Sequence, residues 1–523
     1  MPIASSRTCI TWLERGLIAI LAAASAFFII KTIHWPLVGD GALIHYVVFL
    51  MQHGRAPYRD IIDMNMPGMY LIDWLVIETF GGGSLAWRLF DFSLMALAAA
   101  SMLTIAWPYS KFAGFFSAVL FTLVHGRDGI AQTGQRDLIM AVLLLVSTAC
   151  LFLAARARRP PLVALAAIFA GTAVTIKPTG ALFVVAFAMG TYAFFRGDKA
   201  RLRRSILLGA AAFSMPLGVT TAFLYREHAL IAFWSILHGL VPFHASLDQR
   251  HLSFLLLHSI SPLLSLVIPW IFLVIRTRLW QSTEHRILLA AIACGVLSYC
   301  IQAKGYPYHR YPLLAFLLLS MGIVFTAALR DRGLNKFVGG AALLVGVLVI
   351  APESDLLASE YDWHNQEFIT MLESDLDHLG GADLSGQIQC MDTTAGCINT
   401  LYRMKLVQST SSLYDCYFFA PGDAPITNQL RMRFWQELHA NPPRVLIVSN
   451  QFCLGRPSAY NKVDNWPQFT RYLTQKYSLL EERTPPHMVR WWSVTQAPLG
   501  YRVYLRKITN LAPLPDPAPQ ESQ

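Results

Sequence analysis

Residues 35–41 read Trp-Pro-Leu-Val-Gly-Asp-Gly, and residues 54–68 read Gly-Arg-Ala-Pro-Tyr-Arg-Asp-Ile-Ile-Asp-Met-Asn-Met-Pro-Gly. A single apolar run ends just before them, near Ile33, so that Asp40 follows the end of a hydrophobic segment closely. Carboxylates, arginines and a Pro-Gly break are thus gathered at the edge of a membrane. Ionisable groups at such a position are functional candidates by default.

The composition is that of a membrane protein. Of 523 residues, 54% are hydrophobic and 14% are charged, and the mean hydropathy is +0.43. Soluble domains carry about 25% charged residues. The sequence therefore predicts a chain that crosses the membrane several times.

The excess of positive over negative charge is confined to the apolar part of the chain. Residues 1–351 hold 28 Lys and Arg against 14 Asp and Glu, whereas residues 352–523 hold 14 against 18. Cations in membrane proteins mark cytoplasmic loops. Because no basic stripe with interleaved aromatic residues is present, the charge does not indicate a nucleic-acid partner.

The hydrophobic pattern predicts about eleven transmembrane helices in residues 1–351. The first is interpreted as a signal anchor with its N-terminus inside, and the alternative is a signal peptide cleaved near residues 22–26. The predicted spans are 16–33, 88–107, 109–125, 137–155, 162–177, 180–195, 205–225, 251–275, 287–303, 311–329 and 336–351.

An eleven-span topology places every cationic cluster on one side. The clusters lie at residues 156–159, 196–204, 276–286 and 330–336. With the N-terminus inside, all four fall in the cytoplasm, as the positive-inside rule requires. We therefore expect an integral protein of a bacterial inner membrane with its acid-bearing loops and C-terminal domain outside.

The segment Pro67–Phe80 is apolar but has only 14 residues and carries Asp73 and Glu78. Counting it as a span would invert every later loop. We interpret it as an interfacial helix, with Asp73 and Glu78 on its wet face. The first outer loop then runs over residues 34–87 and holds a second short helix, Gly41–His53, with Asp40 as its N-cap.

Residues 352–510 are predicted to form a separate soluble α/β domain. Residues 444–450 are an apolar run too short for a helix and predict a buried strand. Residues 469–473, which follow Pro467, predict a helix, and residues 501–506 predict a closing strand. Residues 511–523 are rich in proline and predict a disordered tail. Four cysteines of this domain are candidates for up to two disulfides in one of three pairings, or for four buried thiols: Cys390, Cys397, Cys416 and Cys453.

Several nucleotide and hydrolase motifs are absent. The sequence has no P-loop, no GxGxxG after a strand, no HExxH and no GxSxG. An enzyme facing outward has no ATP, so group transfer there requires a pre-activated donor, and a lipid-linked phosphate ester is the obvious kind.

The order of motifs resembles the GT-C superfamily of membrane glycosyltransferases, which includes protein O-mannosyltransferases, aminoarabinose transferases and the glycosyltransferase family 39 group. An acid stands just outside the first span, followed by Gly-x-x-Pro-Tyr-Arg-Asp, a Pro-Gly interfacial helix and Arg88-Leu89. A second outer loop then ends at Asp137, and Lys177-Pro178 and a late aromatic-His-Arg loop follow. The resemblance covers about residues 10–350. It implies a polytopic all-α membrane domain and sugar transfer from a polyprenyl phosphate to a lipid, glycan or protein.

The resemblance also implies roles for individual residues. Asp40 would be the general base of an inverting transfer, with Asp137 positioning the acceptor or the base. Cations or a divalent metal ion would meet the charge on the leaving phosphate. The cation candidates are Lys177, Lys304 and Arg310, and the candidates for an acceptor or metal contact are Asp60, Asp63 and His309. Because Asn65 stands where some relatives carry an acid, a metal ligand set at Asp60 and Asp63 departs from the family pattern.

Each assignment has a structural alternative. Asp40 and Asp137 could cap helices, Asp60 and Asp63 could form a solvated loop, and Lys177 and Lys304 could be interfacial cations. His309 could belong to an aromatic belt. At the level of the whole chain, the rival is a lipid-sugar flippase or transporter, which would carry broken helices with ionisable groups at the midplane in both halves. A polymerase or ligase of surface glycans is a third reading.

Overall fold

The computed structural model describes residues 2–357, 364–420, 424–452, 460–486, 489–491, 494–496 and 499–507. The chain divides into two compact units. The first comprises Met1–Gln366 with Val489–Thr495, and the second comprises Glu367–Met488 with Gln496–Gln523. The main division thus falls C-terminal to the predicted boundary at residue 351. The predicted disordered tail and Cys453 lie outside the described residues.

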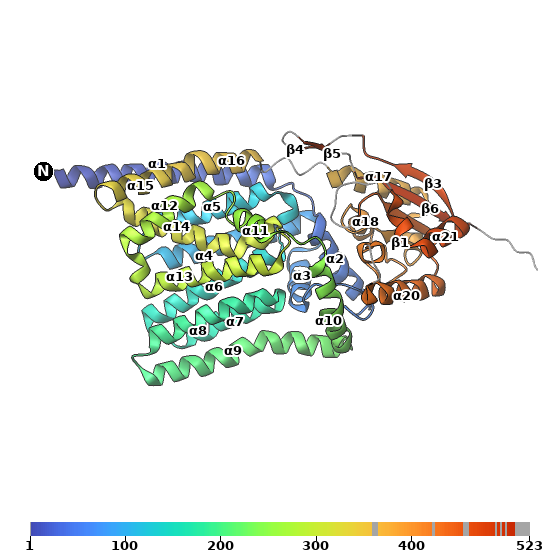
Figure 1. Cartoon of the computed structure of the whole chain (residues 1–523), viewed down its shortest axis with the longest axis horizontal. Coiled ribbons are helices and arrows are strands. Elements are labelled where there is room, and N and C mark those ends of the chain that lie inside the picture. The colour runs from blue at the N-terminus through green and yellow to red at the C-terminus, as the bar shows by residue number, and fades with distance from the viewer. Residues whose placement is uncertain are drawn as a thin grey trace, which may run out of the picture. The chain divides into compact units, whose positions relative to one another are not determined.

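The first unit is a bundle of long helices that run side by side (Figure 1). Its apolar runs form helices because the backbone of a membrane span must satisfy its own hydrogen bonds. The long helices are α1 (Pro2–Thr32), α4 (Ser84–Ala106), α5 (Lys111–Asp128), α6 (Arg136–Ala157), α7 (Pro161–Ile176), α8 (Ala181–Phe195), α9 (Lys199–Arg226), α11 (Leu252–Ser259) with α12 (Leu264–Thr277), α13 (Thr283–Gln302), α14 (Tyr311–Leu329) and α15 (Leu334–Val345), which a short π-helix (Gly346–Ile350) continues into α16 (Ala351–Leu357).

All eleven predicted spans are helical, and the all-α membrane unit is confirmed. Within the described part of the chain, eight helices are long and apolar enough to cross a membrane, or nine if the bent pair α11 and α12 is one span. The eleven predicted spans exceed the larger of these two numbers by two. The shortfall lies in α5, which ends in the polar sequence His-Gly-Arg-Asp, and in α7, whose 16 residues rise only about 24 Å.

Three shorter helices gather at one end of this bundle, opposite the N-terminus of α1: α2 (Gly39–Gln52), α3 (Pro67–Phe80) and α10 (Leu230–Ser246) (Figure 1). Helix α3 has the predicted bounds. It begins at Pro67, whose missing N–H costs nothing in the first turn, and ends before Gly81, which has a φ of +80°.

Two details of this region were predicted wrongly. Asp40 is not the N-cap of α2, because the cap is Val38 and Asp40 lies in the first turn. Asp73 is not on a wet face, because it is fully buried and its Oδ1 lies 3.0 Å from Nδ1 of the buried His45 on α2. Glu78 is exposed, as predicted. The carboxylate of Asp73 thus joins α3 to α2.

Helix α3 also lies very close to α7. A Cβ atom on Gly68 would stand 2.2 Å from Oγ1 and 2.7 Å from the carbonyl carbon of Thr175. Such separations are well inside van der Waals contact, so glycine is required for the approach. This contact fixes the start of α3, and with it the loop that precedes it, against the bundle.

The second unit is a small α/β domain, as predicted. Its four-stranded sheet has the order β1-β2-β6-β3, in which β1 and β2 are parallel and the other pairs antiparallel. Strand β2 is buried throughout, which explains why its sequence is an uninterrupted apolar run. The strands of this sheet are β1 (Ile388–Met391), β2 (Val445–Ser449), β3 (Tyr477–Arg483) and β6 (Tyr501–Arg506), and the main helices are α17 (His364–His378), α18 (Cys397–Arg403), α19 (Cys416–Phe419), α20 (Pro425–Ala440) and α21 (Pro467–Lys476). The short pair β4 (Val489–Trp491) and β5 (Val494–Gln496) is separate from this sheet, and Val489–Thr495 belongs to the first unit.

A disulfide joins Cys390 on β1 to Cys397 at the start of α18, with their Cα atoms 6.0 Å apart. Cys416 is also disulfide-bonded. Three of the four candidate cysteines are thus disulfide-bonded in this structure, and the fourth, Cys453, stays a prediction.

Candidate functional site

The predicted base, Asp40, pairs with an arginine that sequence reasoning had not selected. Its Oδ2 lies 3.1 Å from a terminal nitrogen of Arg136, in the first turn of α6, and the other terminal nitrogen of Arg136 donates to Asn65 Oδ1. The Asp40 side chain is 26% exposed and that of Arg136 is 15% exposed. One guanidinium group therefore holds the Asp40 carboxylate in place while leaving part of it open.

Asp63 anchors the other end of this chain of contacts. Its carboxylate accepts hydrogen bonds from Tyr70 Oη (2.6 Å), Asn65 Nδ2 (2.8 Å) and the Met64 N–H (2.7 Å). Asp63 is buried. These contacts account for its oxygens, so the acid stabilises the loop before α3.

Asp137 and Lys177 form a second ion pair beside the first. Lys177 Nζ lies 2.5 Å from Asp137 Oδ2, and Gln302 approaches Asp137 Oδ1 at 3.4 Å. Asp137 is fully buried, whereas 16% of the Lys177 side chain is exposed. Burial lowers the pKa of Lys177 to about 8, against the opposing effect of Asp137. Asp137 is not an N-cap, because that position belongs to Gln135.

The late loop brings further side chains toward this pair. Lys177 Nζ lies 5.8 Å from the centre of the Tyr308 ring, and His309 interacts electrostatically with Lys177, Arg136 and Lys304. His309 is 6% exposed, and no hydrogen bond to its Nδ1 is found among the described residues. The late loop thus lies beside the Asp137–Lys177 ion pair, which in turn adjoins the pair of Asp40 and Arg136.

Lys304 and Arg310 differ in their partners, since Lys304 binds a carbonyl oxygen and Arg310 pairs with a carboxylate. Lys304 Nζ donates to the carbonyl oxygen of His244 at 2.7 Å, and burial lowers its pKa. Arg310 is buried, pairs with Asp128 at the end of α5 and donates to the carbonyl of Ser261. Its guanidinium group therefore joins α14 to α5 and to the bend between α11 and α12.

The residues suggested for a metal ion do not form a ligand set. The carboxylate of Asp60 binds Arg59 at 2.7 Å and the N–H of Ala56 at 2.9 Å, and that of Asp63 is occupied as described above. Among the described residues, no group of three or more His, Cys, Asp or Glu side chains is arranged to hold a metal ion. We therefore derive no step through a metal.

A buried network at the ends of α4, α5 and α14 was missed. Asp91 pairs with Arg88 and lies 3.1 Å from His125 Nε2, and His125 Nδ1 lies 2.9 Å from the hydroxyl of Tyr311. Asp91 also accepts the N–H of Gly134 at 2.9 Å, two residues before Arg136. Asp91 and His125 both fall in predicted spans, and an ionisable residue in an apolar run is a signal that could have found them.

Comparisons with known proteins bear on the fold and on the class of protein. A family model described as dolichyl-phosphate-mannose-protein mannosyltransferase matches residues 65–225, which include Asn65, Arg136, Asp137 and Lys177. No curated protein matches the chain. Among solved structures, ArnT from Cupriavidus metallidurans bound to undecaprenyl phosphate has a TM-score of 0.56 at 12% identity, over 93% of this chain and 97% of that chain.

This chain has the GT-C fold. The oligosaccharyltransferase of Archaeoglobus fulgidus, tethered to an acceptor peptide, is also similar, with a TM-score of 0.52 at 10% identity over 83% of this chain and 69% of that chain. The arabinofuranosyltransferase AftD from Mycobacteria gives 0.50 at 12% identity, over 94% of this chain but 40% of its own. Two of these three structures are named as sugar transferases, and together with the mannosyltransferase family model they support glycosyl transfer in general, without identifying the sugar, the donor or the acceptor.

Proposed function

We propose that this GT-C protein transfers a sugar from a polyprenyl-phosphate donor to a lipid, glycan or protein acceptor on the outer face of a bacterial inner membrane, with inversion at the anomeric carbon. The observation that carries the proposal is a set of two neighbouring ion pairs, Asp40 with Arg136 and Asp137 with Lys177. Arg136 and Asp137 are consecutive residues at the start of α6, and each pair includes a partly exposed side chain. Asp40 would accept a proton, and the cations beside it would stabilise an anionic leaving group.

Asp40 would act as the general base. It would take the proton of the acceptor hydroxyl as the acceptor oxygen forms its bond to the anomeric carbon. The bond from that carbon to the phosphate oxygen breaks on the opposite face, and its electron pair leaves with the polyprenyl phosphate. Arg136 would orient the carboxylate, and Asn65 in turn would hold Arg136.

The leaving phosphate gains negative charge, which preorganised cations stabilise. Lys177 is the leading candidate, because it is partly exposed and lies next to the base. Arg136 and Lys304 would add to the field. Arg310, already paired with Asp128 in a buried site, would serve the packing of α14, and any contact of Arg310 with donor phosphate would be secondary.

The partners follow from the same chemistry. One similar structure contains undecaprenyl phosphate and another an acceptor peptide, which makes a polyprenyl-phosphate donor and a lipid or peptide acceptor reasonable classes for this chain. The four cationic clusters, if cytoplasmic, would place Asp40 outside. A reporter fused after Ala351 is expected to be active outside the cytoplasm, and a cytoplasmic signal would contradict this orientation.

The test is release of polyprenyl phosphate by the purified protein in lipid. A panel of polyprenyl-phosphate sugars and acceptors is offered to the wild type, to Asp40→Asn and to the control Asp60→Asn, which removes a half-buried acid of the same loop that pairs with Arg59. We expect release to fall about 10²- to 10⁴-fold in Asp40→Asn and little in Asp60→Asn. Near-normal release in Asp40→Asn would refute the assignment of the base. Movement of labelled donor between leaflets without release would favour the flippase.

A further inference from the structure

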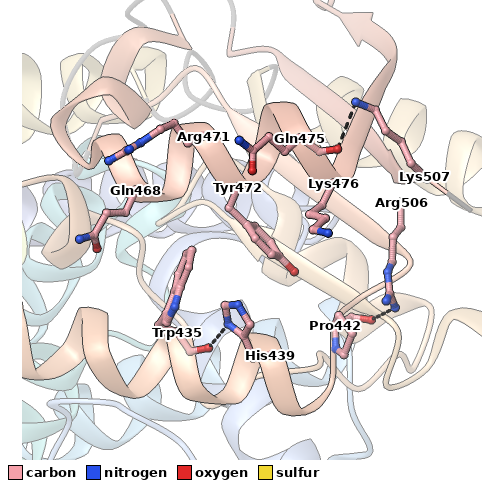
Figure 2. Close-up of a pocket in the computed structure, with 10 residues that line it drawn as sticks. All are labelled: Trp435, His439, Pro442, Gln468, Arg471, Tyr472, Gln475, Lys476, Arg506 and Lys507. Carbon is pink, nitrogen blue, oxygen red and sulfur yellow. Dashed lines mark hydrogen bonds between the residues drawn. The ribbon is translucent and has the colours of Figure 1, made fainter. Parts of the chain in front are cut away.

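The second unit carries a groove that the proposed reaction does not use. It lies between α20 and α21 and consists of two adjoining recesses of about 570 and 500 Å³, which share Trp435, Gln468 and Arg471 (Figure 2). Its lining residues on α20 run from Asn428 to His439, about 16 Å along the helix axis. The groove is thus long enough for more than one ring of a chain-like ligand.

Aromatic side chains form one wall. Trp435 and His439 rise from α20 toward Tyr472 on α21 (Figure 2). The centre of the Trp435 ring lies 5.2 Å from that of Tyr472 and 4.6 Å from that of His439. Trp435 and Tyr472 are half-buried, so each is held by packing while part of its ring remains accessible. Rigid rings with a polar edge bind ligands that present both an apolar face and hydroxyl groups.

Cations and amides form the rim. Arg471, Lys476, Arg506 and Lys507 line the larger recess together with Gln468 and Gln475, and no acidic side chain lines either recess among the residues described. Lys507 donates to the carbonyl oxygen of Gln475, and Arg506 approaches that of Pro442 at 3.4 Å. These contacts keep both charges at the groove without neutralising them. The field in the groove is therefore positive.

We propose that this groove binds an acidic oligosaccharide, a chain of sugars that bear carboxylate groups. The apolar face of each sugar ring would lie on Trp435 or Tyr472, its hydroxyls would meet Gln468 and Gln475, and its carboxylates would meet the cations. A flat anionic membrane would engage exposed cations but not half-buried rings within a recess. The groove belongs to the second unit, so its binding does not require the transfer reaction.

The test is isothermal titration calorimetry on the full chain in nanodiscs of neutral lipid, without donor. The probes are tetragalacturonate, tetramannuronate and, as a neutral control, fully methyl-esterified tetragalacturonate. We expect at least one acidic tetramer to bind about tenfold more tightly than the ester, and its affinity to fall as salt screens the charges.

Variants then separate sugar recognition from simple anion binding. Arg471→Gln combined with Lys476→Gln is expected to weaken binding about tenfold, and Tyr472→Leu about fivefold because a ring face is lost. Lys405→Gln, an exposed cation that lines neither recess, should leave binding unchanged. The charge variants are at exposed positions and are expected to retain the wild-type melting temperature.

Three outcomes would overturn the proposal: neither acidic tetramer binds, the ester binds as tightly as the acid, or the double charge variant binds as tightly as the wild type. Tripolyphosphate that binds as tightly as the tetramer and with no loss in Tyr472→Leu would also overturn it, because the groove would then recognise charge alone. Binding is measured without turnover, so loss of the transfer activity in Asp40→Asn and loss of binding here are independent results.

Discussion

The ion pair of Asp137 and Lys177 makes a prediction about pH. Lys177 has a pKa of about 8 because burial disfavours its charge, while Asp137 opposes that effect. The ammonium is therefore charged below pH 8 and neutral above it. If Lys177 stabilises the leaving phosphate, kcat/KM should decline as pH rises through about 8.

Replacing Asp137 with Asn removes the opposing carboxylate and most of the hydrogen bond. Breaking a buried pair by removing one partner costs about 3 kcal/mol, and 1.36 kcal/mol corresponds to one unit of pKa. Because 16% of the Lys177 side chain is exposed, solvent offsets part of this cost. We therefore expect the alkaline limb of the pH profile to move toward neutral pH by about one unit or more.

The assay is the pH dependence of polyprenyl-phosphate release between pH 5.5 and 9.5. Asp137→Asn should be nearly inactive at pH 8 and recover on acidification, whereas Lys177→Arg, whose guanidinium stays charged, should lose the limb near pH 8. Asp60→Asn is the matched control and should keep the wild-type profile. An Asp137→Asn enzyme with an unmoved alkaline limb would refute the coupling of the two residues.

Three further results are expected. Gly68→Val should lower the unfolding free energy by about 1–3 kcal/mol, because the new side chain collides with Thr175; an unchanged melting temperature would contradict the close contact of α3 with α7. Arg310→Gln should destabilise the protein by about 3 kcal/mol or more through the unpaired Asp128, with KM for the donor nearly unchanged in the folded fraction; a large rise in KM with no thermal effect would instead assign Arg310 to donor binding. Cys390→Ser should destabilise the second unit by about 2 kcal/mol, measured as a melting temperature below that of the oxidised wild type; an unchanged melting temperature would contradict a stabilising role of this disulfide.

Helices and strands could be predicted from the sequence where residues close in the chain determine their ends. Helix α3 begins at Pro67 and ends at Phe80, before Gly81, and β2 is an apolar run between prolines and a polar residue, so neighbouring residues settle their bounds. The many long apolar segments predicted the membrane unit, and the loss of apolar character after residue 351 predicted a separate soluble domain. The number of spans was less secure, because α5 and α7 pack as helices without the full length or hydropathy of a span.

The candidate site was only partly accessible in this way. Asp40 was selected from its position after an apolar run, and Asp137 and Lys177 from the resemblance to the GT-C superfamily; the structure places the three in two neighbouring ion pairs. Arg136 stood beside Asp137 in the sequence but had no visible partner. Its importance depends on Asp40, 96 positions earlier, which only the packing of α2 against the start of α6 brings within reach.

The sequence by itself determined that this protein is a helical membrane protein with an appended α/β domain, because burial of apolar runs and the alternation of charge at their ends depend on residues close in the chain. Tertiary structure alone decided which carboxylate each cation meets. Arg310 and Lys177 look equivalent as outer cations, yet Arg310 pairs with Asp128, 182 positions away, whereas Lys177 pairs with Asp137, 40 positions away. Such pairings are set by how helices pack, and no local pattern encodes them.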